Sequence, residues 1–392
     1  MTSDTRLAPA LPRLVARTER IADVARLTDC FGIDGTAWLD GESGFVTSGV
    51  AAIVDPRDAV AALRGIDHDP GDAPRDIGPR AVGALPFAGR GRMVIPARVD
   101  TRDRSGCVWR TTVESPDHAD EPRIAAHATA PGRYTIGQRT NFAAWEASVV
   151  AALALIEAGA AEKIVLAREV VIEADAAFDV REVLDALHVT QPGCIVYADG
   201  GFVGASPELL VRRTGDAVLA RPMAGTGIDA AELVRSEKDA REHRFVVDSV
   251  CEALVPTCTE VAANGPAPVA LTDVTHLATT ITARVRDRET SAVDLALALH
   301  PTPAVAGTPR DAALAAIRRL EPTPRDLYAG PCGWVDAHGD GAFVVALRGA
   351  QIDGPRARLH AGAGIVTGSN ATAEWAETRA KLEPMLRALL RV

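Results

Sequence analysis

Two predicted helices each carry a pair of carboxylates three residues apart. Asp239 and Glu242 form the pair on a long central helix, and Glu374 and Glu377 form the pair on the last helix of the chain. Residues at this spacing share a helix face, so two such helices facing each other would bring four carboxylates together. Carboxylate oxygens suit Mg²⁺, a hard cation that keeps water ligands and often takes a ligand from its substrate. An acidic pair at this spacing is more often solvated helix surface, and the residues alone leave both interpretations open.

A lysine and a glutamate could transfer protons. Lys163 opens a strand, where a lysine is usually an edge residue that reaches for solvent; as a general base it would need burial or a nearby cation to lower its pKa. Glu208 follows Pro207 at a turn. It is either a capping or salt-bridged residue, or a general acid that its surroundings keep protonated.

Two glycines near the C-terminus, Gly362 and Gly364, could let backbone N–H groups approach a carboxylate. The spacing to Gly368 does not fit a dinucleotide-binding fingerprint, and the flanking segments are not strand–helix–strand. The sequence contains no Walker loop, nucleophile elbow, HExxH or CxxC motif. These observations indicate an α+β protein with a candidate acidic metal site.

The elements that must position these residues alternate between hairpins and helices. Few strand–helix–strand units occur, which favours a mainly antiparallel sheet with helices packed outside it, an α+β build. We expect strands over 163–173, 194–199, 201–205, 209–213, 217–221, 332–336, 341–348 and 358–366, helices over 143–159, 231–254, 292–299, 310–320 and 371–390, and surface loops over 66–79 and 114–123.

Composition limits the classes of partner. The 392-residue chain has a net charge of -10 and a pI near 5.5, so it offers no basic surface for nucleic acid. Its six cysteines are scattered, which favours free thiols over a disulfide framework or a zinc site. The sequence shows no leader-like start and no apolar run of membrane-spanning length, so we expect a soluble, cytoplasmic protein that does not contact a membrane.

Read in order, nine segments resemble the chorismate-binding (chorismate-utilising) enzyme family: 163–168, 204–208, 221–226, 236–243, 300–305, 328–334, 343–348, 362–366 and 374–381. A thinner match covers 83–87. The resemblance implies one large domain over 1–392, with a less recognisable part over 1–140 and a motif-bearing catalytic part over 141–392. It further implies two stacked layers of mainly antiparallel sheet flanked by helices.

The resemblance also implies roles for individual residues. Glu242 and Glu377 match residues that bind Mg²⁺ directly, Asp239 and Glu374 match residues that support it, and the metal holds the ring carboxylate of chorismate. The expected substrate contacts are Ala224, Gly225, Thr226, His276, Thr302, Tyr328, Arg348, Gly362, Gly364 and Lys381.

Lys163 and the stretch 300–307 resemble the isochorismate synthase branch. There, Lys163 would take a proton from water that attacks C2, while Glu208 protonates the departing C4 hydroxyl. The alternatives are a salicylate synthase, which would go on to eliminate pyruvate, an anthranilate or aminodeoxychorismate synthase component, and a non-catalytic chorismate-binding paralogue. The isochorismate branch implies no glutamine amidotransferase partner, and siderophore and menaquinone synthesis remain alternative destinations of its product.

Overall fold

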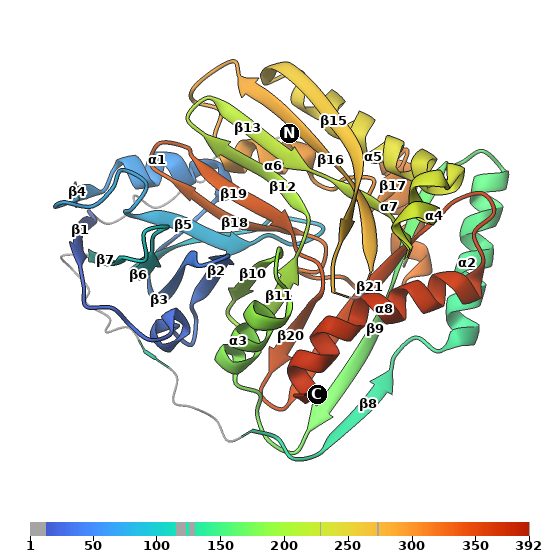
Figure 1. Ribbon diagram of the computed structural model, residues 1–392, viewed down its shortest axis with the longest axis horizontal. Coiled ribbons are helices and arrows are strands. Elements are labelled where there is room, and N and C mark those ends of the chain that lie inside the picture. The colour runs from blue at the N-terminus through green and yellow to red at the C-terminus, as the bar shows by residue number, and fades with distance from the viewer. Residues whose placement is uncertain (1–12, 115–122, 125–129, 228, 273, 392) are drawn as a thin grey trace, which may run out of the picture.

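A computed structural model describes residues 13–114, 123–124, 130–227, 229–272 and 274–391. Most of the loop expected over 114–123 therefore lies outside the described residues. Every described strand belongs to one hydrogen-bonded network. Strand pairing is antiparallel throughout the described residues, apart from the short pairing of β1 with β4. The α+β fold class expected from the sequence is confirmed (Figure 1).

The network folds into two layers, which are joined where β5 pairs with β6 at Val82 and Val94. The first layer runs through β4 (Asp67–Asp69), β1 (Val15–Arg20), β7 (Val108–Glu114), β6 (Met93–Arg102), β3 (Ser43–Val54), β2 (Thr36–Asp40), β10 (Ile195–Asp199), β11 (Phe202–Ser206), β20 (Gly349–Asp353), β21 (Arg356–Ile365) and β9 (Lys163–Ala174), with β8 (Tyr134–Gln138) and β17 (Gly307–Thr308) beyond it. The second runs through β5 (Arg80–Ala84), β18 (Pro331–Asp336), β19 (Gly341–Val345), β12 (Leu209–Thr214), β13 (Ala217–Arg221) and β16 (Thr275–Val285), which also pairs with β14 (Met223–Gly227) and β15 (Cys258–Ala270).

Apolar side chains fill the space between the layers and the space under the helices. Phe45 and Tyr197 from the first layer meet Val82 and Val344 from the second in one buried cluster. The helices that cover the outer faces are α1 (Ala59–Arg64), α2 (Phe142–Glu157), α3 (Val180–Thr190), α4 (Ala230–Arg235), α5 (Glu237–Leu254), α6 (Ala292–Leu299), α7 (Arg310–Leu320) and α8 (Ala371–Leu390), with 3₁₀ turns η1 (Leu27–Cys30) and η2 (Pro56–Asp58). No described helix combines the length and the apolar character that a bilayer crossing needs. All six cysteines are free.

The helix expected over 231–254 is interrupted, and this corrects the sequence-based prediction. Ser236 has an extended backbone and separates α4 from α5. Its hydroxyl accepts a hydrogen bond of 3.2 Å from the backbone N–H of Asp239. Serine favours such N-caps because its oxygen satisfies a donor that the first helical turn leaves free. The acidic pair of α5 therefore begins in the first turn of a new helix.

Strands from the N-terminal third are part of the same sheet as the motif-bearing part. β2 pairs with β10, and β5 pairs with β18. The Asp199 carboxylate joins both parts, because it accepts hydrogen bonds from the backbone N–H of Ala84 at 2.8 Å and from the Thr36 hydroxyl at 3.2 Å.

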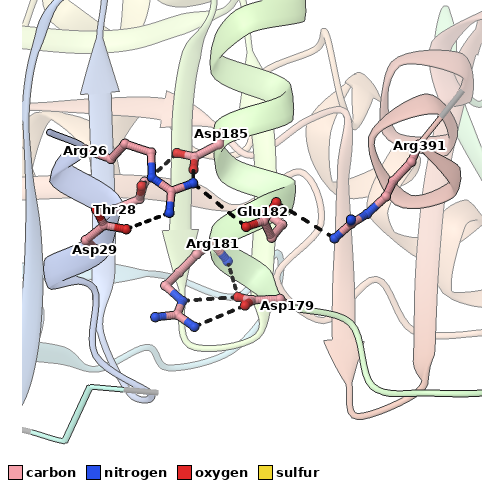
Figure 2. Close-up of polar contacts among 8 residues, drawn as sticks. All are labelled: Arg26, Thr28, Asp29, Asp179, Arg181, Glu182, Asp185 and Arg391. Carbon is pink, nitrogen blue, oxygen red and sulfur yellow. Dashed lines mark hydrogen bonds and ion pairs between the residues drawn. The ribbon is translucent and has the colours of Figure 1, made fainter. Parts of the chain in front are cut away.

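A polar network on α3 also connects distant segments (Figure 2). Arg26, just before η1, lies 3.0 Å from Asp185, whose carboxylate also accepts a 2.7 Å hydrogen bond from Thr28. Arg391, at the end of α8, lies 3.8 Å from Glu182. Exposed ion pairs of this kind contribute little each, so the strand pairings carry the attachment. That the whole chain is one cooperative unit stays a prediction.

Candidate active site

A cavity opens beside β14, β16 and β21, with α5 and α8 at its rim. Its empty volume is about 730 Å³, including the open mouth. Eleven of the sixteen site residues expected from the sequence line it: Glu208, Ala224, Gly225, Thr226, Glu242, His276, Tyr328, Arg348, Gly362, Gly364 and Lys381.

Lys163 lies behind the cavity wall and is completely buried. Its Nζ is 2.8 Å from Oε1 of Glu242. The contact is an ion pair that joins β9 to α5. Burial alone would raise the pKa of Glu242, but the Lys163 charge lowers it below its ordinary value.

Gly364 leaves the space in which this ion pair sits. A Cβ atom at Gly364 would be 2.5 Å from the Glu242 carboxylate and 2.9 Å from Cε of Lys163. Gly362 faces the same side of β21, since alternate strand residues share a face. A Cβ there would meet its neighbours no closer than 3.2 Å. Gly364 is therefore the position where the absence of a side chain matters more.

Glu208 stands at the turn between β11 and β12 and is also buried. Its backbone N–H donates to the Ser206 hydroxyl at 3.2 Å, and that hydroxyl donates to the Val345 carbonyl at 2.6 Å. Burial raises the pKa of Glu208 to about 7, although a backbone hydrogen bond from Met223 and the charge of Lys163 oppose the shift. A carboxyl group with this pKa can hold a proton near neutral pH, as a general acid must.

Arg348 reaches the cavity from the connection between β19 and β20. Its backbone adopts φ 50°, a left-handed conformation that costs a non-glycine residue on the order of 1 kcal/mol. The guanidinium donates to Nε2 of His276 at 3.0 Å, and Nδ1 of His276 lies 3.1 Å from the Gly225 carbonyl. Burial, with the Lys381 and Arg348 charges, lowers the pKa of His276 to about 3. His276 is therefore neutral and holds Arg348 in place.

Tyr328 and Lys381 complete the wall around Gly362. The Tyr328 ring stacks on His360 with centroids 5.3 Å apart. Lys381 donates to the Gly362 carbonyl at 3.1 Å and lies 2.6 Å from Oε1 of Glu377. Lys381 and Arg348, with Arg325, therefore place three cations in the wall of a cavity that Glu242 also lines. This arrangement suits a small anionic ligand.

Of the four acids expected to hold a metal, only Glu242 lines the cavity, and three of the four contact lysines. Glu242 pairs with Lys163, Glu377 with Lys381, and Glu374 with Lys238 at 3.0 Å. Burial raises the pKa of Glu374, and the nearby Glu377 charge raises it further. The fourth acid, Asp239, lies beside Gly225, where an added Cβ would be 3.2 Å from its Oδ1.

Chemically, this donor set fits a hard divalent cation, because all its ligand atoms are carboxylate oxygens. As the side chains lie, no three His, Cys, Asp or Glu residues in the described part of the chain are grouped closely enough to hold a metal ion. Each glutamate turns to an ammonium group instead. The residues fit Mg²⁺ if these ion pairs rearrange when the ion binds.

Arg168 fixes α8 against β9, the two elements that carry Glu377 and Lys163. Its guanidinium lies 3.9 Å from the Trp375 ring centroid, and its Nε donates to the Thr378 hydroxyl at 2.7 Å. Along α8, Trp375 directly follows Glu374, and Thr378 directly follows Glu377. The contact with Arg168 therefore fixes the rotation of the helix turn that carries both acids.

Five of the expected residues do not line the cavity. Lys163, Asp239, Glu374 and Glu377 lie behind or beside its wall. Thr302 is buried in the turn before Ala304 and Val305, and these two residues line the cavity in its place. The Thr302 carbonyl accepts hydrogen bonds from Val305 and Ala306, so its position there shapes the turn.

Sequence reasoning missed two charged or polar residues of the wall, His360 and Arg325. His360 could have been found, because it is two residues before Gly362 on one strand and so shares its face. Arg325 donates to the carbonyls of Val165 and Val305 and to Glu321. Arg325 therefore supports the wall, and nothing in its local sequence predicted those distant partners.

Comparisons with known proteins agree with this geometry. The family described as chorismate binding enzyme matches residues 92–390. Isochorismate synthase DhbC of Bacillus subtilis is 35% identical over 337 residues, which are 79% of this chain and 81% of that protein. Isochorismate synthase EntC of Escherichia coli is 37% identical over 270 residues, 65% of this chain and 68% of that protein. The structure of MenF, the menaquinone-specific isochorismate synthase of Escherichia coli, superimposes with a TM-score of 0.80 at 25% identity, covering 98% of this chain and 96% of that one.

Proposed function

Since this chain belongs to the family of chorismate binding enzymes, we propose that it is an isochorismate synthase that converts chorismate to isochorismate. Relatives that carry this name match most of the chain, and the cavity has the size and charge for a small dicarboxylate. The observation that carries the proposal is that two buried titratable side chains lie close to one cavity, since Glu208 lines it and Lys163 lies behind its wall.

The two groups suit opposite roles. Water attacks C2 of the ring and loses a proton to Lys163, while the C4 hydroxyl takes a proton from Glu208 and leaves as water. One water is consumed and one is released, so the reaction is an isomerisation. The pKa of Glu208, raised to about 7 by burial, provides the protonated carboxyl that the leaving group needs.

The cations that line the cavity bind a carboxylate of the substrate. Arg348 presents a planar guanidinium that can pair with a carboxylate in two places, and its contact with His276 fixes its direction. Lys381, Gly362 and Gly364 line the same cavity. These groups orient the enolpyruvyl carboxylate of chorismate relative to the proton-transfer pair.

We further propose Mg²⁺ as the cofactor, held by Glu242 and Glu377 with support from Asp239 and Glu374. The ion would bind the ring carboxylate and balance its charge. With Glu242 bound to the ion, Lys163 would be released from its ion pair with that carboxylate.

Incubation with chorismate and Mg²⁺, followed by chromatographic identification of the product, tests the function. Isochorismate as the sole product, without added ammonia and without a second subunit, is the expected result. Salicylate with an equal amount of pyruvate would instead identify a salicylate synthase. Product formation that requires ammonia would identify an anthranilate-type enzyme, and no turnover would identify a non-catalytic paralogue.

A further inference from the structure

All three lysines of the chain contact glutamates of the expected metal site. Of the 42 basic residues, 39 are arginine, and the three exceptions are Lys163, Lys238 and Lys381. They come from β9, α5 and α8, and each contacts a different glutamate at 2.6 to 3.0 Å. Everywhere else in the chain the basic residue is arginine, so the ammonium group is confined to this one place.

Lys238 differs from the other two lysines in its exposure. Its side chain is 42% exposed, against 0% for Lys163 and 22% for Lys381. Its partner is buried instead, since the Glu374 side chain is only 3% exposed. Lys238 also lies within electrostatic range of Glu242 and Glu377. One partly exposed cation thus lies near three of the four carboxylates expected to surround the metal.

A buried carboxylate without a counter-charge is strongly unfavourable, so Glu374 needs a cation whenever no metal is bound. A lysine suits a temporary partner, because its ammonium is a point charge on a flexible stem that can turn out to water. An arginine would hold the carboxylate through two parallel hydrogen bonds and would be harder to displace.

We propose that Lys238 is an internal counter-ion of the metal site, which neutralises Glu374 in the metal-free enzyme and withdraws to solvent when a divalent cation binds. The proposal rests on the magnesium site of the proposed function. It adds a positioning residue outside the expected ligands, and it implies that Lys238 and the metal compete for the same carboxylates.

Calorimetric titration with Mg²⁺ alone, without chorismate, tests the competition. Lys238→Met should bind Mg²⁺ more tightly than the wild type, on the order of fivefold, since a partly exposed ion pair is lost to the competitor. Arg241→Met is the matched control: it removes one positive charge from the exposed face of the same helix and should leave the affinity nearly unchanged. Equal affinity of the wild type and Lys238→Met, or an equal gain in both variants, would overturn the proposal.

Thermal unfolding gives a second readout that survives a loss of activity. Lys238→Met should have a lower Tm than the wild type in chelator, and Mg²⁺ should raise its Tm by more. A merely structural ion pair would lower Tm by the same amount with and without Mg²⁺, and that result would contradict displacement.

Amine labelling can follow the movement itself, because only three lysines and the chain's α-amino group can react. Reductive methylation read by peptide mass spectrometry should be faster at Lys238 when Mg²⁺ is present, with the chain's α-amino group as the internal reference. An unchanged or slower rate at Lys238 would refute the withdrawal. Neither binding nor labelling uses chorismate, so a different reaction product would overturn the proposed function and leave these results standing.

Discussion

Arg348 and His276 determine each other's state through one hydrogen bond. The guanidinium can only donate, so Nε2 of His276, 3.0 Å away, must accept. The imidazole proton is therefore on Nδ1, which donates to the Gly225 carbonyl at 3.1 Å. A buried histidine that is neutral and locked in one tautomer can orient Arg348 but cannot exchange protons with a substrate near neutral pH.

Replacing this histidine should weaken substrate binding more than turnover. We expect His276→Ala to raise KM for chorismate about tenfold, because a hydrogen bond to a charged group is lost, while kcat changes less. Steady-state kinetics at several pH values measures both. The pKa of His276 is near 3, so the wild type and the variant should share the same pH dependence between pH 5 and 8. If one limb of the pH profile of the wild type were absent from the profile of the variant, His276 would titrate during catalysis.

An alanine at Gly364 should damage the site while sparing the fold. The added Cβ would press on the mobile ends of Glu242 and Lys163 rather than on backbone. A displacement of about 1 Å in a catalytic group can cost on the order of 10²-fold in rate, so kcat should fall by that order with little change in Tm. Gly362→Ala is the control on the same face, where contacts stay at 3.2 Å or more. Equal losses in both variants would show that the Lys163–Glu242 ion pair is not what Gly364 accommodates.

Glu208→Gln should lower kcat by about 10²–10⁴-fold, the usual contribution of a general acid. Burial raises the pKa of Glu208 to about 7, so wild-type turnover should fall as pH rises above that value. The same shift affects stability. Between its unfolded pKa of 4.5 and about 7, the folded state binds more protons than the unfolded state, so stability falls as pH rises.

The glutamine variant should therefore be more stable than the wild type at pH 8, by on the order of 3 kcal/mol. The difference should vanish below pH 4.5, where Glu208 is protonated in both states. Denaturant titrations at pH 4.5, 6 and 8 measure it. A constant difference across that range would mean that the carboxyl group does not change its protonation.

Lys163→Met should reduce kcat by about 10²–10⁴-fold, with a far smaller change in KM. Water would then lack an efficient base, so isochorismate should form slowly and no other product should replace it. The wild-type profile of kcat against pH should be bell-shaped, with limbs that report the acid and the base as a coupled pair. Near-normal kcat in Lys163→Met would remove the base assignment and the main support for the isochorismate reaction.

Chelation should abolish turnover, and added Mg²⁺ should restore it. Glu377→Gln should be inactive yet keep one cooperative thermal transition, because its side chain is only partly buried and its loss frees Lys381 to bind the Gly362 carbonyl alone. Calorimetry should show weaker Mg²⁺ binding to this variant. Full activity of the wild type in excess chelator would refute the metal proposal.

Much of the fold and the site followed from local patterns. Hairpin spacing predicted the antiparallel sheet, and helical spacing predicted that each acidic pair lies on one helix, because both patterns depend on neighbours within a few residues. The interruption at Ser236 was missed because a helical stripe continues across it, and only the capped backbone shows the break. His360 was missed, although it lies two residues before Gly362 on the same strand and therefore on the same face.

By itself, the sequence determined the family, the fold class and which residue types could do chemistry. The tertiary structure alone decided their chemical state. Lys163 meets Glu242 across two elements, Lys238 meets Glu374 from 136 residues away, and Arg348 meets His276 from 72 residues away. Charge state depends on burial and on these distant partners, and neither is encoded in local spacing. A glutamate in a turn becomes a general acid only when the packed sheets exclude water from it.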